Sequence, residues 1–205
     1  MIPATEALQR LKEGNHRFVT GQGGAKLPHG PADFAELCEG QTPFAVILGC
    51  SDSRVPVELV FDQGMGDLFV VRVAGNIPFD SQIGSIEYAV QVLGARLVVV
   101  LGHSQCGAVQ ATLSALRFPN PAGGGKIPIL VEKIRPSLEP LIRGQKADDN
   151  DNLLQDAVRA KIDGSLSILE TESQILAELL KKRELTVIGA EYDLGSGKVD
   201  FWEKR

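Results

Sequence analysis

Three side chains that could bind a soft metal ion follow two apolar runs of the chain. Cys50 follows residues 44–48, and His103 and Cys106 follow residues 97–101. Thiolate and imidazole are the ligands that zinc prefers in proteins, and a zinc ion with three protein ligands keeps a fourth position for water. Such a water ionises near neutral pH and provides a hydroxide nucleophile. The pattern therefore predicts a catalytic zinc site formed by Cys50, His103 and Cys106.

Two charged residues lie close to the first of these ligands. Asp52 and Arg54 are two residues apart in a segment without apolar periodicity, so both side chains can point the same way. Arg54 can bind both oxygens of the Asp52 carboxylate, which would keep it ionised and oriented as a hydrogen-bond acceptor. The alternatives are a surface ion pair, and for the ligands themselves a capping turn with buried thiols. We favour a catalytic pair beside the metal.

The elements that must position these residues are strands buried on both faces. The apolar runs are continuous and rich in branched residues, as is typical of parallel strands. They cover residues 44–48, 68–73, 97–101 and 185–188. A helical stripe with Ile86 and Val90 separates the second run from the third, and residues 199–202 complete a hairpin. We therefore predict an α/β fold: a mostly parallel sheet of four strands plus an antiparallel edge strand, flanked by helices.

The remaining segments complete a single domain, residues 1–205. An amphipathic helix is predicted over residues 3–20, and the Gly- and Pro-rich stretch after it suggests an N-terminal helical arm, residues 1–35, that lies apart from a core of residues 36–205. A partner subunit is the expected contact of such an arm. Later helices are predicted at 127–141, 153–162 and 169–180, with loops at 118–126 and 144–152.

Composition restricts the partners of the chain. A net charge of -5 and a pI near 5.3 provide no overall basic field for nucleic acid or anionic membrane, so we expect a small-molecule substrate. The apolar runs are too short to cross a bilayer, and the amino end lacks the pattern of a secretory signal. We expect a cytoplasmic location. Three cysteines are too few for a disulfide scaffold, and Cys38, the third, is expected to be buried.

The motifs around the ligands resemble those of the β-class carbonic anhydrases. C-S-D-S-R-V-P begins at Cys50, and G-H-S-Q-C-G, which contains His103, follows about fifty residues later. Residues 64–76 and 85–90 and the helix around residues 13–15 are similar to the family too, so the resemblance covers most of residues 5–115. It implies one zinc ion per subunit, bound by the three predicted ligands.

The resemblance also implies roles for further residues. Asp52 and Arg54 match the conserved dyad of the family. The residues that match its substrate site are a glutamine from a neighbouring subunit, two apolar wall residues and one backbone N–H: Gln41, Phe69, Tyr88 and Gly107. The resemblance further implies a homodimer or homotetramer with active sites at the subunit interface.

One subdivision of the family can be recognised from the sequence. Members that are inhibited by bicarbonate hold it with a Trp, an Arg and a Tyr. Here Ile47 stands where the Trp is expected, although Arg72 and Tyr192 match the other two. We therefore expect the open type of site, in which Asp52 pairs with Arg54 and water holds the fourth zinc position.

The implied reaction is the reversible hydration of carbon dioxide to bicarbonate and a proton by attack of zinc-bound hydroxide. Two alternatives stay open at this point: hydrolysis of carbon disulfide or carbonyl sulfide on the same scaffold, and a non-catalytic protein with structural zinc. The sequence does not identify the proton carrier. His16 and His29 qualify by residue type alone.

Overall fold

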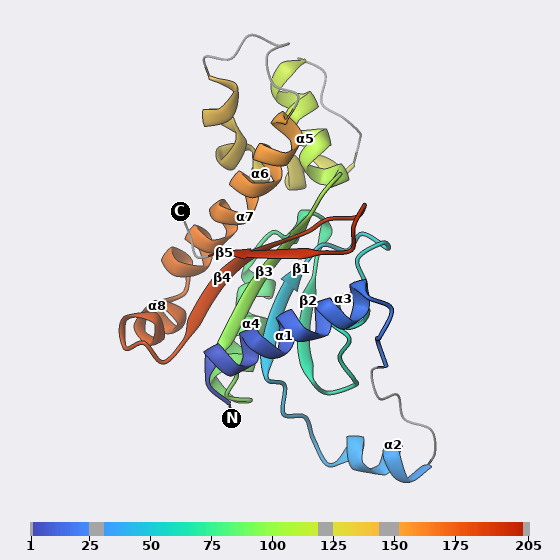
Figure 1. Cartoon of the computed structure of the whole chain (residues 1–205). Helices are drawn as coiled ribbons and strands as arrows, with labels where there is room; N and C mark the ends of the chain where they lie inside the picture. Colours follow the sequence, from blue (N-terminus) through green and yellow to red (C-terminus); the bar gives the residue numbers. More distant parts are fainter. Residues whose placement is uncertain (1, 25–30, 119–124, 144–151, 203–205) are drawn as a thin grey trace.

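The computed structural model of the chain describes residues 2–24, 31–118, 125–143 and 152–202 (Figure 1). Its centre is a five-stranded sheet in the order β2-β1-β3-β4-β5. The strands are β1 (Ala45–Gly49), β2 (Leu68–Arg72), β3 (Leu97–His103), β4 (Thr186–Tyr192) and β5 (Val199–Trp202). The first four pair in parallel, and β5 pairs antiparallel with β4 at the edge. The predicted sheet is confirmed.

Helices cover both faces of the sheet. The helices are α1 (Ala4–Val19), α2 (Pro31–Cys38), α3 (Val57–Val60), α4 (Asp80–Gln91), α5 (Gly107–Arg117), α6 (Ile127–Ile142), α7 (Leu153–Glu172) and α8 (Gln174–Lys181), with a 3-10 turn, η1 (Ala74–Asn76). None of the helices in the described part of the chain is long and apolar enough to cross a membrane.

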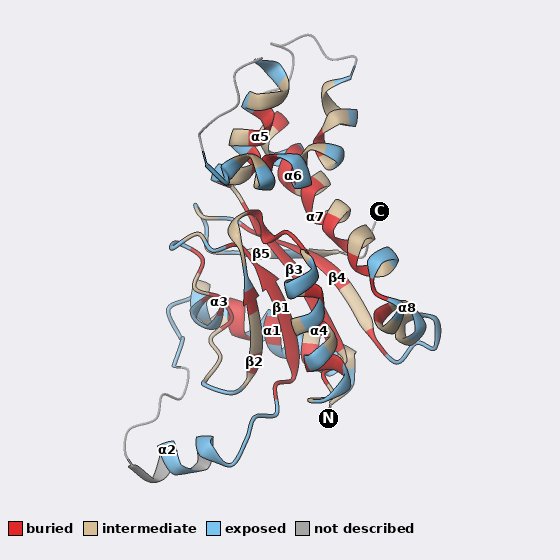
Figure 2. Cartoon of the chain, turned by 180° about the vertical axis from the view of Figure 1, so that it is seen from behind, coloured by how far each residue is buried: buried red, intermediate tan, exposed pale blue. Residues whose placement is uncertain are grey.

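The two central strands are buried on both faces (Figure 2). Val46 and Leu48 of β1 belong to the core shared with helices α4 to α8. Ala45 and Ile47, the alternate residues, belong to a second core with α1 and α3. Because successive side chains of a strand point to opposite faces, both faces require apolar residues, which explains the continuous apolar runs.

The N-terminal helix is confirmed, but its expected position apart from the main body is wrong. Ala7 and Leu11 of α1 are fully buried in the second core. The Asn15 side chain donates to the Val60 carbonyl at 3.1 Å and accepts from the Val199 N–H at 2.9 Å. The amphipathic face of α1 is therefore used within the chain itself.

The element that stands away from the body is α2 (Figure 1). Cys38, at its end, is exposed, which corrects the expectation that this thiol is buried. The exposed fraction of Phe34 is 53%, so α2 also presents an apolar side chain to solvent.

The C-terminal helices divide at a different place from the prediction. α7 continues through the gap between the two predicted helices and ends at Glu172. Ser173 then caps α8, because its Oγ accepts the Leu176 N–H at 3.1 Å. Most of the two predicted loops, residues 119–124 and 144–151, lies outside the described residues.

Two glycines let α7 approach the sheet closely. A Cβ atom on Gly102 of β3 would lie 2.6 Å from Ile162 Cδ1, and one on Gly189 of β4 would lie 2.9 Å from Ile162 Cγ2. Real side chains do not tolerate such contacts, so these glycines set the distance between α7 and the sheet. As a result, the middle of α7 lies close to the carboxyl half of β3.

Candidate metal centre and catalytic site

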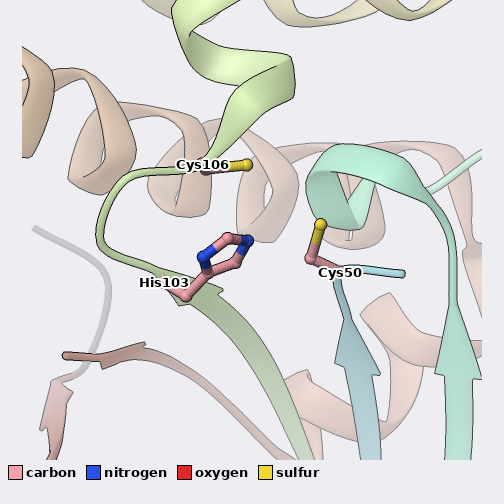
Figure 3. Close-up of side chains that lie close together, drawn as sticks. All are labelled: Cys50, His103 and Cys106. Atoms are coloured by element: carbon pink, nitrogen blue, oxygen red, sulfur yellow. The ribbon is translucent and has the colours of Figure 1, made fainter. Parts of the chain in front are cut away.

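The three predicted ligands meet at the carboxyl ends of β1 and β3 (Figure 3). Cys50 directly follows β1, His103 is the last residue of β3, and Cys106 precedes α5. Their ligand atoms all lie within 4.8 Å of one another, and all three residues are buried. Adjacent parallel strands end at the same edge of the sheet, and this brings together residues that are far apart in sequence.

The ring of His103 is oriented for a metal ion. Nδ1 lies 2.9 Å from the Ser104 carbonyl oxygen, and because that oxygen can only accept, Nδ1 carries the proton. Nε2 is then an acceptor. It is fully buried and has no hydrogen-bond partner among the described residues. A buried, unpartnered nitrogen facing two thiols fits a zinc ion in both donor set and placement.

The loop that carries His103 and Cys106 is held mainly by backbone groups. The Ser104 N–H donates to the Tyr192 carbonyl at 2.9 Å, and Ser104 Oγ accepts the Leu194 N–H at 2.9 Å. Gln105 has a φ of 58°, a left-handed conformation that reverses the chain between the two ligands. Cys106 then stands at the N-terminus of α5, where helix N–H groups favour a thiolate.

The loop after β1 is held by an arginine from the neighbouring strand. Arg72 Nε donates to the Cys50 carbonyl at 2.9 Å, and its Nη2 donates to the Asp52 carbonyl at 2.7 Å. We had not predicted this role for Arg72. The role depends on the register of the two strands, which makes Arg72 the partner of Gly49 at the end of β1.

Asp52 and Arg54 form the predicted pair beside the cluster. Arg54 Nε lies 2.9 Å from Asp52 Oδ1, and Nη2 lies 2.7 Å from Oδ2. The Arg54 N–H also donates to Oδ1 at 3.0 Å. This guanidinium holds the pKa of the Asp52 carboxyl well below its usual range. Asp52 Oδ2 lies 3.8 Å from His103 Nε2, so the carboxylate borders the cluster.

The thiols themselves are polarised. A hydrogen bond from Cys106 lowers the pKa of Cys50 to about 4, although burial opposes the shift. The Gly75 N–H also donates to Cys50 Sγ, at 3.3 Å. The hydrogen bond with Cys50 and burial raise the pKa of Cys106 in turn, so the two thiols share one proton, and a metal ion that binds both sulfurs must displace it.

The other predicted site residues divide into two groups. Gly107 is exposed and begins α5. It lies at the cluster because it directly follows the ligand Cys106. Gln41 precedes β1 and is exposed at the opposite end of that strand from Cys50. Phe69 and Tyr88 contact each other with ring centroids 6.2 Å apart. Phe69 is the register partner of Val46, about 13 Å before Cys50 along the sheet.

The structure also shows where the three residues considered for a bicarbonate site lie. Ile47 and Tyr192 are buried, and Arg72 is already bound to two backbone carbonyls. Of the two histidines considered as proton carriers, His16 is exposed on α1, whereas His29 lies outside the described residues.

Comparison with protein families gives a match over most of the chain. Residues 45–199 match the family model described as carbonic anhydrase. Carbonic anhydrase 2 of Mycobacterium tuberculosis is 40% identical over 193 residues, which cover 94% of this chain and 89% of that protein. A carbonic anhydrase of Mycolicibacterium smegmatis is 40% identical over 195 residues, covering 95% and 91%.

Solved structures give the same family. One of two tetrameric β-carbonic anhydrases from Sordaria macrospora matches with a TM-score of 0.72 and 26% identity, covering 83% of this chain and 86% of that chain. The β-carbonic anhydrase CafA of Aspergillus fumigatus matches with a TM-score of 0.71 and 26% identity, covering 98% and 91%.

Proposed function

The chain belongs to the β-class carbonic anhydrases, and we propose that it catalyses the reversible hydration of carbon dioxide to bicarbonate and a proton. One observation carries the proposal: a buried set of two thiols and one unpartnered imidazole nitrogen lies directly beside an Asp52 carboxylate that Arg54 holds ionised. This arrangement combines a metal site with a fixed hydrogen-bond acceptor.

Cys50 Sγ, His103 Nε2 and Cys106 Sγ are the atoms that would hold the zinc ion. Bound there, zinc supplies a Lewis acid that makes water a nucleophile near neutral pH. Two thiolates and one neutral imidazole balance the charge of the ion, so the site adds little net charge to the buried end of the sheet.

The surrounding residues orient the reactants in this proposal. Asp52 accepts a hydrogen bond from the attacking water, so that an oxygen lone pair points at the carbon of CO2. Arg54 keeps Asp52 ionised and turned in one direction. The Gly107 N–H lies in the first turn of α5, where helix N–H groups lack intrahelical acceptors, and it donates to the substrate oxygen on which charge develops.

We propose that Gln41, Phe69 and Tyr88 complete the site of a neighbouring subunit in a homodimer or homotetramer. Their position supports this: Gln41 lies at the amino end of β1, far from the cluster of its own chain. The exposed fractions of Tyr88 in α4 and of Val92, which directly follows α4, are 48% and 65%, so the end of this helix presents an apolar surface that a second subunit would cover. The cytoplasmic location stays a prediction.

Mixing two inactive variants tests this assignment. A Cys106→Ser subunit lacks a metal ligand but has an intact Gln41, whereas a Gln41→Ala subunit has the opposite defect. In a mixed dimer, the intact cluster of one subunit meets the intact Gln41 of the other, so we expect activity to return after co-refolding. If Gln41 served its own cluster, mixing would restore nothing. Sedimentation analysis gives the oligomer size.

Stopped-flow CO2 hydration by the zinc-loaded protein, from roughly pH 6 to 9, tests the reaction itself. We expect hydration that scales with zinc content, and none after chelation. Carbon disulfide offered in a separate assay distinguishes the second candidate, since turnover of CS2 without CO2 hydration would refute the proposal. A zinc-loaded protein that is inactive on both gases would favour structural zinc.

A further inference from the structure

A lysine is buried in the helix layer close to the metal cluster. Lys161 lies in α7 and only 2% of it is exposed. Removing an ammonium group from water is costly unless partners compensate for it. Burial lowers the pKa of Lys161 to about 7, while the thiolates of Cys106 and Cys50 act in the opposite direction. A lysine at this depth therefore calls for a specific partner.

The partners of Lys161 are a backbone carbonyl and a hydroxyl of its own helix. Lys161 Nζ lies 3.2 Å from the Asn76 carbonyl oxygen and also contacts Ser165 Oγ, one helical turn further along α7. Ser165 Oγ lies 3.3 Å from the same carbonyl oxygen. Two donors from one helix thus converge on the last residue of η1. They join α7 to the turn that follows β2.

The turn has a conformation that needs such support. Gly75 has a φ of 72° and Asn76 a φ of 43°, so two consecutive residues are left-handed. A Cβ on Gly75 would lie 2.9 Å from Ile134 Cδ1 and 3.1 Å from Ala108 Cβ, so α5 and α6 pack closely against the turn. Left-handed residues other than glycine persist where their surroundings hold them. Lys161 and Ser165 provide that constraint at Asn76.

The same turn contacts the metal cluster. The Gly75 N–H donates to Cys50 Sγ at 3.3 Å, and the next residue is the one held by Lys161. Hydrogen bonds to a ligating atom orient it and tune the metal. An unbroken set of contacts therefore leads from the ammonium of Lys161, through Asn76 and Gly75, to the sulfur of Cys50.

We propose that Lys161 is a positioning residue of the metal centre: together with Ser165 it fixes the Ala74–Asn76 turn so that the Gly75 N–H is directed at Cys50 Sγ. The inference rests on the proposed function in so far as Cys50 binds zinc, and it does not depend on the identity of the substrate. A lysine that only stabilised the packing of α7 would support folding without affecting the metal.

Substitution of Lys161 by Met in the zinc-loaded protein separates these two roles, because Met removes the charge and keeps an unbranched side chain. We expect zinc release to excess chelator to accelerate about tenfold, the effect typical of losing an outer partner of a ligand. We also expect a shifted sulfur-to-metal charge-transfer band in the Co2+-loaded protein, and a lower kcat with little change in KM. Wild-type zinc release and an unshifted band, even with reduced thermal stability, would overturn the inference.

Two further variants keep the test decisive. Ser165→Ala removes one of the two donors and leaves Lys161 in place, so it should change zinc release in the same direction by a smaller factor. If Lys161→Met does not fold, unchanged release in Ser165→Ala overturns the inference. Lys181→Met, at an exposed lysine of α8, is the matched control and should leave both readouts unchanged. Wild-type protein that binds zinc but does not hydrate CO2 would refute the proposed function and not this inference, since neither metal readout requires turnover.

Discussion

The two loops that carry the metal ligands are built in different ways. The loop of residues 103–106 is held by uncharged groups: the Ser104 N–H donates to Tyr192 at the end of β4, the Ser104 hydroxyl accepts the Leu194 N–H, and α5 begins directly after Cys106. The loop of residues 50–54 is held by charged side chains: Arg72 binds two of its carbonyls, and Arg54 binds the Asp52 carboxylate. The first loop supplies two of the three ligands. The second supplies one ligand and the proposed catalytic carboxylate.

This difference suggests a division of tasks. Peptide and hydroxyl groups do not ionise near neutral pH, so the loop of residues 103–106 offers the metal a fixed geometry. An arginine bound to a carboxylate sets both its orientation and its charge, which suits a group that takes part in the chemistry. Substitution of a ligand should therefore affect metal binding, whereas substitution of Asp52 or Arg54 should affect the rate.

The largest effect is expected from Cys106→Ser. A serine hydroxyl is a poor zinc ligand, so the variant should lose both bound zinc and CO2 hydration. Metal analysis after dialysis, together with stopped-flow kinetics, measures both losses. Cys38→Ser is the matched control, because Cys38 is exposed and lies outside the cluster, and it should retain full zinc and full rate. Retained stoichiometric zinc in Cys106→Ser would show that this loop does not fix the metal.

Asp52→Asn should lower the rate and spare the metal. The amide keeps the size of the side chain but removes its charge and the acceptor capacity of one oxygen atom, so kcat should fall about a hundredfold. Zinc content should stay at the wild-type value. Stopped-flow kinetics on protein of measured zinc content tests this, with Asp80→Asn in the first turn of α4 as control. Loss of zinc in Asp52→Asn would remove the distinction between the two loops.

Arg54→Met should have an intermediate effect on rate and a defined effect on titration. Because Arg54 lowers the pKa of Asp52, its removal should return that pKa toward the ordinary value of about 3.9. The pair therefore stabilises the fold above that pH, and the contribution is lost as the pH falls through the lowered pKa of the folded state. Carboxyl 13C NMR measures the shift, and kcat/KM should fall about tenfold.

Arg143→Met is the control for that variant, because Arg143 forms a surface pair with Glu139 and its side chain is 80% exposed. It should change neither the titration of Asp52 nor the rate. An Asp52 pKa that is the same in Arg54→Met and in the wild type would mean that another group sets the charge of the carboxylate.

The same contrast explains what the sequence could predict. The ligand cluster followed from local patterns, because continuous apolar runs such as residues 97–101 mark buried parallel strands, and such strands end at one edge. Asp52 and Arg54 were predictable because they are close in sequence. The contacts that hold the loop of residues 50–54 were not predictable, since the hydrogen bonds of Arg72 to Cys50 and Asp52 depend on the register of β2 with β1.

The position of α1 shows a related limit. Its amphipathic pattern predicted a buried face but not which surface covers that face, and the Gly- and Pro-rich segment after it favoured a separate arm. One available signal was Gly14 inside the helical pattern. A Cβ there would lie 1.8 Å from the Phe61 carbonyl oxygen, so this glycine permits the close approach of α1 to the segment after α3.

The smallest expected effect tests whether the Ser104 hydroxyl, which anchors the loop of residues 103–106, matters for stability more than for rate. In Ser104→Ala the Leu194 N–H loses its acceptor, and the free energy of unfolding of the zinc-loaded protein should fall by about 1 kcal/mol. The Ser104 N–H bond to Tyr192 remains, so the positions of His103 and Cys106, and hence zinc content, should change little. Urea denaturation measures the loss.

Ser85→Ala, which removes only a hydrogen bond to Ser81 within α4, is the control and should lose less stability. A fall in kcat without a fall in stability would mean that Ser104 acts on the chemistry, and the division between an anchoring loop and a catalytic loop would then have to be abandoned.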